Sequence, residues 1–399
     1  MPENATHSSQ PITVGAGFII LLSALMALTS LSTDIYLPAM PMLGRELHGD
    51  AEQLTITGFL IGFTIAQLVW GPISDQLGRK VPLIIGMLLF IAGSVGCAIS
   101  SSMTQMVFWR VFQALGACTG PMLARSMIRD LFSRSRAAAM LSTLMIMMAI
   151  APIGGPLLGG LIIEFSSWPV IFWLLAVTGV MLLLALLTLP ETLPEERRVR
   201  ATFNGAFSNY FSLLKNGLFL RYTLSLTSYY MAIYAFIAGS PLVYISYYGV
   251  SPQHYGWLFA VNIVGVMLIS TVNRRLVQRY PLDILLKTAL SIASLAAILL
   301  TLAAGMKTGG IVFLAVMMFF TFSMNGVIAA TSIAAALDEV PEFAGSASAL
   351  VGALQYGSGI VSTGLLSLFS DNTPWTMSWI IGLFTTTGAM MVLTVKRRH

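Results

Sequence analysis

Two charged residues stand inside long apolar segments, where a charge is costly and usually serves function. Asp34 lies within residues 33–38, Thr-Asp-Ile-Tyr-Leu-Pro, and Arg110 interrupts an apolar segment at residues 103–118. Burial favours the neutral acid and a nearby cation favours the carboxylate, so a buried aspartate near an arginine suits proton exchange near neutral pH. Because arginine keeps its proton, we expect Arg110 to tune Asp34 or to hold a substrate.

Each of these residues also has a structural interpretation. Asp34 could be an interfacial helix-end residue that accepts hydrogen bonds from backbone amides, since Pro38 and Pro41 follow it. Arg110 could extend its side chain to the membrane surface while its stem stays in apolar surroundings. The counter-charge hypothesis therefore predicts that both side chains lie at similar depth and inside the protein.

Further polar and aromatic residues are candidates for a substrate cavity. With 23 methionines and 22 phenylalanines, the chain can build a large apolar pocket with few hydrogen-bonding groups. The candidates are Tyr36, Gln113, Tyr230, Tyr234, Asn262, Asn325 and Gln355. Each could instead be a contact between helices or an interfacial aromatic residue, so the prediction concerns the set.

A short charged loop breaks the apolar sequence at residues 71–80, Gly-Pro-Ile-Ser-Asp-Gln-Leu-Gly-Arg-Lys. Its conformational residues are expected to be Gly71, Asp75, Gly78, Arg79 and Lys80. Together with the charges of residues 125–136, including Arg129, this loop could form a gate that closes one face of the protein. Ordinary placement of positive charge in cytoplasmic loops would explain the arginines but not Asp75.

Residues 151–160, Ala-Pro-Ile-Gly-Gly-Pro-Leu-Leu-Gly-Gly, combine four glycines and two prolines. The expected motif residues are Gly154, Gly155, Pro156, Gly159 and Gly160. Small residues let helices approach closely, and prolines are tolerated where neighbours compensate. This pattern predicts a bendable helix that rocks against its neighbours, although static packing would use the same residues.

Composition places these residues in membrane helices. The 399 residues are 56% hydrophobic and 9% charged, whereas soluble domains carry about a quarter charged residues. Apolar gaps between charged residues predict an all-α integral membrane protein with twelve spans, the first ending near Asp34. Eighteen of the 21 Lys and Arg residues fall in loops after even-numbered spans or at the C-terminus, which predicts that both termini are cytoplasmic.

The longest loop separates six spans from six. We therefore predict a six-helix bundle at residues 1–190, a cytoplasmic linker at 191–217 and a second six-helix bundle at 218–399.

Three motifs resemble those of the major facilitator superfamily. The loop at 71–80 resembles its Gly-x-x-x-Asp-Arg-x-Gly-Arg-Arg/Lys pattern, with Gln76 in place of the first arginine. Residues 110–116 resemble Arg-x-x-Gln-Gly-x-Gly, with Ala114 replacing a glycine, and residues 151–160 resemble the motif of its antiporters, with Ala151 replacing the first glycine. Residues 32–39, 190–198 and 336–347 look like the Bcr/CflA, bicyclomycin-resistance-like branch of the drug:proton antiporters.

The resemblance implies a proton-coupled antiporter that exports small amphipathic drugs or metabolites across a bacterial inner membrane. It implies that protons are the coupling ion, that no other cofactor or metal is needed, and that a monomer contains the pathway. It also implies that Asp75 faces residues 344–347 when the protein opens outward. The partners expected are the substrate and the lipid bilayer, without nucleic acid.

Other functions remain as alternatives. A dedicated metabolite exporter or a proton-coupled importer would use the same fold, and a channel or receptor fits two charged, similar halves less well. An enzyme is disfavoured because the sequence contains no Gly-x-x-x-x-Gly-Lys-Ser/Thr loop and its four histidines are scattered.

Overall fold

The computed structural model describes residues 16–48, 52–132, 134–198 and 210–393, and every regular element among them is helical. The first part of the chain forms α1 (Ala16–Asp34), η1 (Leu37–Ala39), α2 (Met40–Glu46), α3 (Leu54–Leu77), α4 (Lys80–Ala98), α5 (Met103–Ala117), α6 (Thr119–Leu131), α7 (Arg134–Phe165), α8 (Trp168–Leu187) and η2 (Glu195–Arg197). The second part forms α10 (Gly217–Pro241), η3 (Leu242–Tyr247), α11 (Pro252–Leu276), α12 (Leu282–Gly305), α13 (Gly310–Ser323), α14 (Asn325–Asp338), η4 (Pro341–Phe343), α15 (Ala344–Leu368) and α16 (Pro374–Leu393).

Eleven helical runs among the described residues are long and apolar enough to cross a membrane. The protein is therefore a multi-pass membrane protein. The predicted fourth span is divided between α5, of 15 residues, and α6, of 13 residues. Each piece is shorter than the roughly 20 residues that a single crossing needs, so α5 and α6 would have to cross together.

We expected the first span to end near Asp34, and α1 does end at that residue. Helical structure resumes after Asp34 in η1 and α2, and Gly17–Glu46 forms one candidate span of 30 residues. Asp34 therefore lies at a break inside the span, where its side chain is buried. The prediction ended each span at a charged residue. It therefore ended the first span at Asp34, although the tertiary structure buries this carboxylate.

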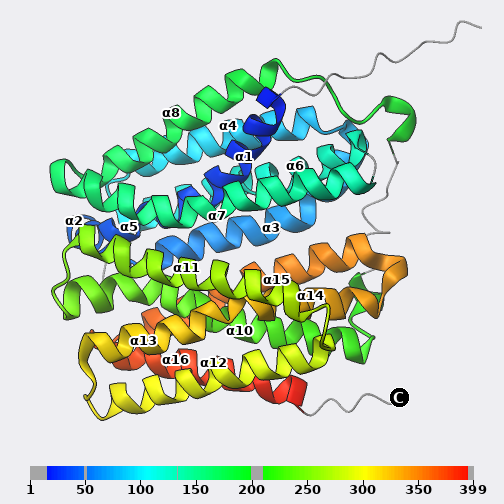
Figure 1. The fold of residues 1–399 in the computed structure, drawn as a ribbon. Helices are drawn as coiled ribbons and strands as arrows, with labels where there is room; N and C mark the ends of the chain where they lie inside the picture. The colour runs from blue at the N-terminus through cyan, green and yellow to red at the C-terminus, as the bar shows by residue number, and fades with distance from the viewer. Residues whose placement is uncertain (1–15, 49–51, 133, 199–209, 394–399) are drawn as a thin grey trace, which may run out of the picture.

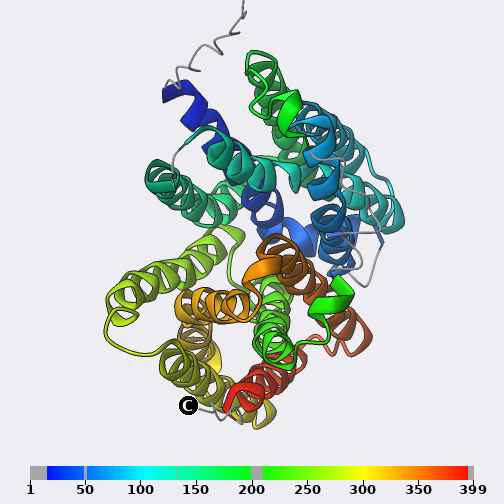
Figure 2. The ribbon, with the colours of Figure 1, turned by 90° about the vertical axis from the view of Figure 1, so that its right-hand side faces the viewer.

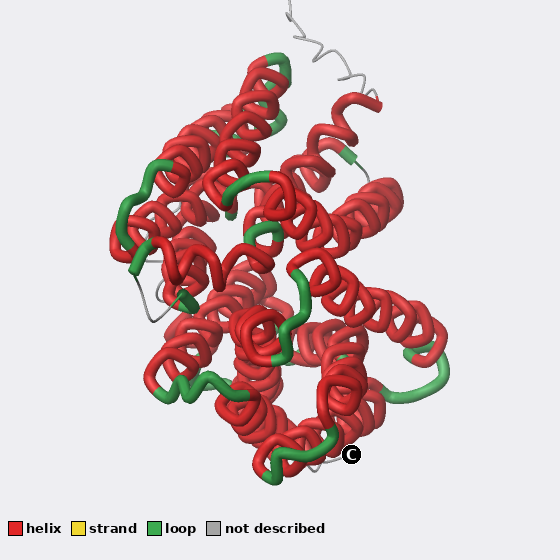
Figure 3. The backbone as a smooth tube through the Cα atoms, turned by 90° about the vertical axis from the view of Figure 1, so that its left-hand side faces the viewer, coloured by secondary structure: helices red, strands yellow, loops and turns green. Residues whose placement is uncertain are grey.

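The helices pack in two groups that follow the order of the chain. In Figure 1, α1 to α8 lie above α10 to α16, and Figures 2 and 3 view the two ends of the bundle. The groups meet chiefly where α7 packs along α11 and α3 packs along α15. The predicted domain limits at 190 and 218 stay predictions, and residues 199–209 of the linker lie outside the described residues.

Glycines set the closest helix contacts within the first group. On α3, a Cβ added at Gly62 would collide with the backbone carbonyl of Val111 on α5, and one at Gly58 would collide with that of Val107. These two positions lie one turn apart, so together they define the line along which α3 and α5 touch.

We predict that Gly62→Ala destabilises the protein by about 1–3 kcal/mol, because the added methyl group must displace the backbone of α5. The measurement is thermal unfolding of the detergent-purified protein. Gly364→Ala is the matched control, since a Cβ there meets no atom within 4 Å. Equal melting temperatures for the two variants would contradict the packing argument.

Candidate functional site

A cavity of about 500 Å³ lies between the two groups of helices. Its walls come from α1, α3, α5 and α7 on one side and from α10, α11, α13, α14 and α15 on the other. On α11 and α14 the lining continues to Ser270 and Ala330, toward the ends of these helices that precede charged loops. A volume of this size suits a drug-sized molecule.

Contacts between the groups close the opposite end of this cavity. The Thr57 hydroxyl of α3 donates to the Thr363 hydroxyl of α15 at 2.6 Å. On the other side, a Cβ at Gly160 would lie 2.7 Å from the Pro252 carbonyl oxygen, and one at Gly256 would lie 2.9 Å from that of Pro156. The predicted glycine motif therefore brings α7 against α11, where larger residues would hold the helices apart.

Asp34 lines the cavity at the end of α1, and two motif glycines hold α7 against it. A Cβ at Gly155 would lie 3.2 Å from the Asp34 Cβ, and one at Gly159 would collide with the Ile35 carbonyl oxygen. Gly154 has no such neighbour, since a Cβ there meets nothing within 4 Å. The two glycines on the Asp34 face thus explain why α7 and the break after α1 pack so closely.

Arg110 is fully buried on α5, so its side chain does not extend to the membrane surface. Its Nη1 donates to the Ser32 carbonyl at 3.0 Å and to Gln113 Oε1 at 2.6 Å, and its Nε donates to the Thr55 carbonyl at 3.4 Å. The guanidinium carbon lies 4.3 Å from the centre of the Tyr36 ring and 4.5 Å from that of Phe59. Carbonyl dipoles and ring faces therefore stabilise the buried cation.

Asp34 and Arg110 line the same cavity, but no nitrogen of Arg110 lies within 4 Å of the Asp34 carboxylate. Their connection runs through the backbone. Ser32 lies in the last turn of α1, where carbonyl groups lack donors within the helix, and Arg110 supplies one. Arg110 therefore stabilises the helix end that carries Asp34, and its Nη2 has no hydrogen-bond partner.

Four of the predicted cavity residues line the cavity: Tyr230, Tyr234, Asn325 and Gln355. Tyr36, Gln113 and Asn262 lie elsewhere. The Tyr36 hydroxyl is hydrogen-bonded to the Thr55 hydroxyl at 3.1 Å. The Gln113 amide donates to the Ser94 hydroxyl of α4 at 2.8 Å. The Asn262 amide donates to a backbone carbonyl of its own helix.

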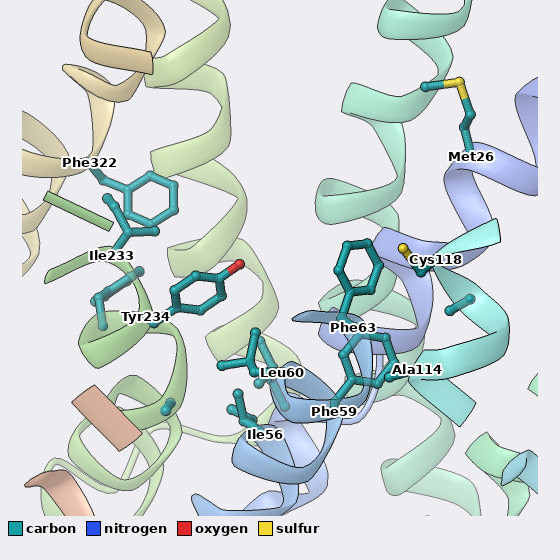
Figure 4. Close-up of a cluster of buried hydrophobic side chains, with 14 of the residues drawn as sticks. Met26, Ile56, Phe59, Leu60, Phe63, Ala114, Cys118, Ile233, Tyr234 and Phe322 are labelled. Carbon is teal, nitrogen blue, oxygen red and sulfur yellow. The ribbon is translucent and has the colours of Figure 1, made fainter. Parts of the chain in front are cut away.

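Sequence reasoning missed the aromatic wall of the cavity. Phe59, Phe259, Phe322 and Tyr356 all line it, and the Tyr356 ring lies 4.1 Å from the Phe63 ring across the two groups. Figure 4 shows Tyr234 directing its hydroxyl into the space that separates Ile233 and Phe322 from Leu60 and Phe63. Only the position of Tyr356 beside Gln355 could have indicated this wall, because phenylalanines are too common here to carry a signal.

The charged loop after α3 forms a compact cluster around Arg79. The guanidinium donates to Asp75 at 2.7 Å, to Asp130 of α6 at 2.8 Å and to Ser74 at 2.9 Å. Arg129 instead contacts Ser126 at 3.3 Å. The predicted charge cluster therefore forms through Asp130, and the proposed contact of Asp75 with residues 344–347 in another conformation stays a prediction.

Glu191, which follows α8 at the C-terminal end of the first group, holds this loop in place. Its carboxylate accepts backbone N–H groups from Arg79 at 2.8 Å, Lys80 at 3.0 Å, Thr192 at 2.9 Å and Leu193 at 3.0 Å. Gly78, at φ +91°, leaves room for it, since a Cβ there would lie 2.5 Å from Glu191 Oε2. Burial acts to raise the pKa of Glu191, but these four donors hold it below its ordinary value.

No three His, Cys, Asp or Glu side chains of the described ranges come close enough together to bind a metal ion.

Comparisons with known proteins identify the architecture. Residues 22–363 match the family model described as Major Facilitator Superfamily. "Uncharacterized MFS-type transporter YdgK" of Bacillus subtilis is 34% identical, over 87% of this chain and 88% of its own. "Bicyclomycin resistance protein homolog" of Haemophilus influenzae is 29% identical over 92% of each chain, and "Multidrug resistance protein D" of Escherichia coli is 27% identical over 94% of this chain and 93% of its own.

A solved structure shares the fold. The xylose transporter XylE of E. coli, in a partially occluded inward-open conformation, superposes with a TM-score of 0.74 at 15% identity. The match covers 96% of this chain and 97% of XylE.

We predict that Arg110→Lys lowers stability by about 1–3 kcal/mol, because an ammonium cannot reach two carbonyl groups while stacking between two rings. Thermal unfolding in detergent measures it. Arg129→Lys is the control, because its guanidinium makes one weak hydrogen bond to Ser126. The interpretation fails if both variants melt with the wild type.

We predict that Glu191→Gln lowers stability by about 1 kcal/mol at pH 7, because the amide loses the charge and directs N–H groups at backbone donors. The folded-state pKa of Glu191 is depressed, so its contribution is complete above the unfolded value of about 4.3 and is lost as the pH falls through the folded value.

The difference in melting temperature between wild type and Glu191→Gln should therefore be constant from about pH 7 to about pH 5 and shrink at lower pH. Glu196→Gln is the control, since its exposed side chain leaves stability unchanged. A difference that grew on acidification would exclude this role for the carboxylate.

Proposed function

Because the chain belongs to the Major Facilitator Superfamily, in its bicyclomycin-resistance-like branch, we propose that it is a proton-coupled antiporter that exports small amphipathic drugs or metabolites. The observation that carries the proposal is a cavity between the two helix groups in which Asp34 is the only carboxylate among the described residues. The chain belongs to a transporter family and shares the fold of a transporter, which is consistent with this proposal and not with an enzyme.

The lining of the cavity supports amphipathic substrates. Rings of Phe59, Tyr234 and Tyr356 offer apolar and cation-binding faces, while Asn325 and Gln355 offer amide groups. The Asn325 Oδ1 atom is buried without a hydrogen-bond partner, so a donor on a substrate could satisfy it. Export of drugs is supported by the names of two relatives, which refer to bicyclomycin resistance and to multidrug resistance.

We propose twelve spans, with α5 and α6 crossing as one, and cytoplasmic termini. Loops rich in Lys and Arg stay in the cytoplasm, and one of these loops follows α11, toward whose end the cavity extends, whereas the loop after α14 is acidic. The membrane is then a bacterial inner membrane, and one chain contains the whole pathway.

In the mechanism, Asp34 exchanges a proton for substrate. Protonated from the outer side, it is neutral and lets the helix groups rock until the cavity faces the cytoplasm, where loss of the proton accompanies substrate capture. No cofactor other than the proton is required. Arg110 contributes by fixing the end of α1 and by its charge, and the Arg79 cluster contributes a contact that breaks and forms as the inner face opens.

A dedicated metabolite exporter or a proton-coupled importer on this fold is the alternative. The contacts of Gly155, Gly159 and Gly160 favour export, because the resemblance associates this glycine motif with antiporters.

We predict that Asp34→Asn lowers the rate of substrate-driven proton movement about tenfold or more, because an amide cannot exchange a proton. The assay adds phenicols, bicyclomycin or lipophilic cations to everted vesicles that hold a proton gradient. Glu196→Gln, outside the cavity, is the control.

Wild type and the control should collapse the gradient when a substrate is added. If Asp34→Asn still coupled proton movement to the substrate, the proton site would be another residue. Binding of a compound without any proton movement, in wild type as well, would favour a uniporter.

A further inference from the structure

A second cavity, of about 650 Å³, lies at the far end of the second helix group. It is bounded by η3, by the ends of α12 and α13 that face each other across residues 306–309, and by the start of α16. This end of the bundle lies opposite the start of α1 and the end of α16 in Figure 1. The cavity shares no lining residue with the cavity that contains Asp34.

Two opposite charges line this second cavity. Lys307 and Asp371 are both exposed, and neither forms an ion pair with any residue in the part of the chain that the structure describes. The backbone of Lys307 is in the left-handed region, at φ +53°, in the turn between α12 and α13. The charges therefore remain available to a bound molecule that carries both signs.

The position of Asp371 is set by its own loop. Its carboxylate accepts the Thr373 hydroxyl at 2.6 Å, the Thr373 amide at 3.0 Å and the Thr376 hydroxyl at 3.1 Å. Partial burial acts to raise the pKa of Asp371, but these hydrogen bonds lower it overall, so the group is ionised at neutral pH. The carboxylate is exposed, so its charge is also open to a cation on a bound molecule.

The rest of the lining is apolar and aromatic. Leu300, Phe313 and Leu314 form its floor, with Tyr247 and Trp375 at the rim. Outside the cavity, Leu302, Met306 and Val312 expose 57, 72 and 72% of their surfaces, as residues facing lipid chains do. Tyr and Trp concentrate where a membrane meets water, which places the cavity at the headgroup level.

We propose that this second cavity binds the headgroup of a zwitterionic phospholipid of the ethanolamine class. The phosphate pairs with Lys307, and the primary ammonium donates to the exposed carboxylate of Asp371. The acyl chains lie along the exposed face at Leu302, Met306 and Val312.

The two charges distinguish this ligand from others. An anionic lipid would pair with Lys307 but meet the Asp371 carboxylate, and an amphipathic cation would meet Lys307. A choline lipid carries both charges, but its quaternary ammonium has no N–H group to donate to Asp371. Selectivity among these compounds therefore tests the pair.

The test uses the full chain, purified and stripped of lipid in detergent, and native mass spectrometry to count retained lipid. The probes are dioleoyl lipids with ethanolamine, choline or glycerol headgroups. Retention of the ethanolamine lipid should exceed that of the other two about fivefold, and Lys307→Gln and Asp371→Asn should each remove the preference.

Arg45→Gln is the control and should keep the preference, because Arg45 lies on α2 of the first helix group and does not line the second cavity. Melting temperature and monodispersity of each variant show that it is folded.

Equal retention of the three lipids, or an unchanged preference in both variants, would overturn the proposal. If the protein preferentially retained the glycerol lipid, and retained more of it in Asp371→Asn, the cavity would be an anionic-lipid site instead. Binding of tetraphenylphosphonium that rises in Lys307→Gln and falls in Asp371→Asn would indicate a second cation site instead.

Discussion

The first helix group depends on the burial of one permanent charge. A guanidinium removed from water requires hydrogen bonds or ring faces for its stabilisation. Arg110 finds them in the carbonyls of Ser32 and Thr55 and in two aromatic rings. The Ser32 carbonyl is available because α1 ends two residues later, so the buried cation and the helix break at Asp34 are parts of one arrangement.

Close contacts of α7 connect this arrangement to the second helix group. The same ten-residue stretch packs against the backbone beside Asp34 through Gly155 and Gly159 and against α11 through Gly160. A movement of α7 relative to one of these neighbours therefore changes its contact with the other. On the opposite side, α3 meets α15 through the Thr57 hydroxyl and the ring of Phe63. The cavity lies between these two seams, which suits an alternating opening of its ends.

The loop between α3 and α4 shows how a residue distant in sequence can support a motif. Glu191 lies more than 100 residues after Arg79, yet its carboxylate caps the start of α4 and occupies the space that Gly78 leaves. The backbone of the loop is thus held by Glu191, while the Arg79 side chain is held by Asp75 and Asp130. Backbone and side chain of one loop are constrained by different parts of the chain.

The sequence by itself determined the membrane class, because apolar length is a local property, and its motifs identified the transporter family. It also singled out Asp34, Arg110 and the glycine motif as candidates, because isolated charges and small-residue spacing are local properties too. It did not determine that helical structure resumes directly after Asp34, that Arg110 contacts carbonyls and rings, or that Tyr36 and Gln113 lie outside the cavity lining. Those features were decided by the tertiary structure, because the face a side chain presents and the partners that stabilise a buried charge come from helices distant in sequence.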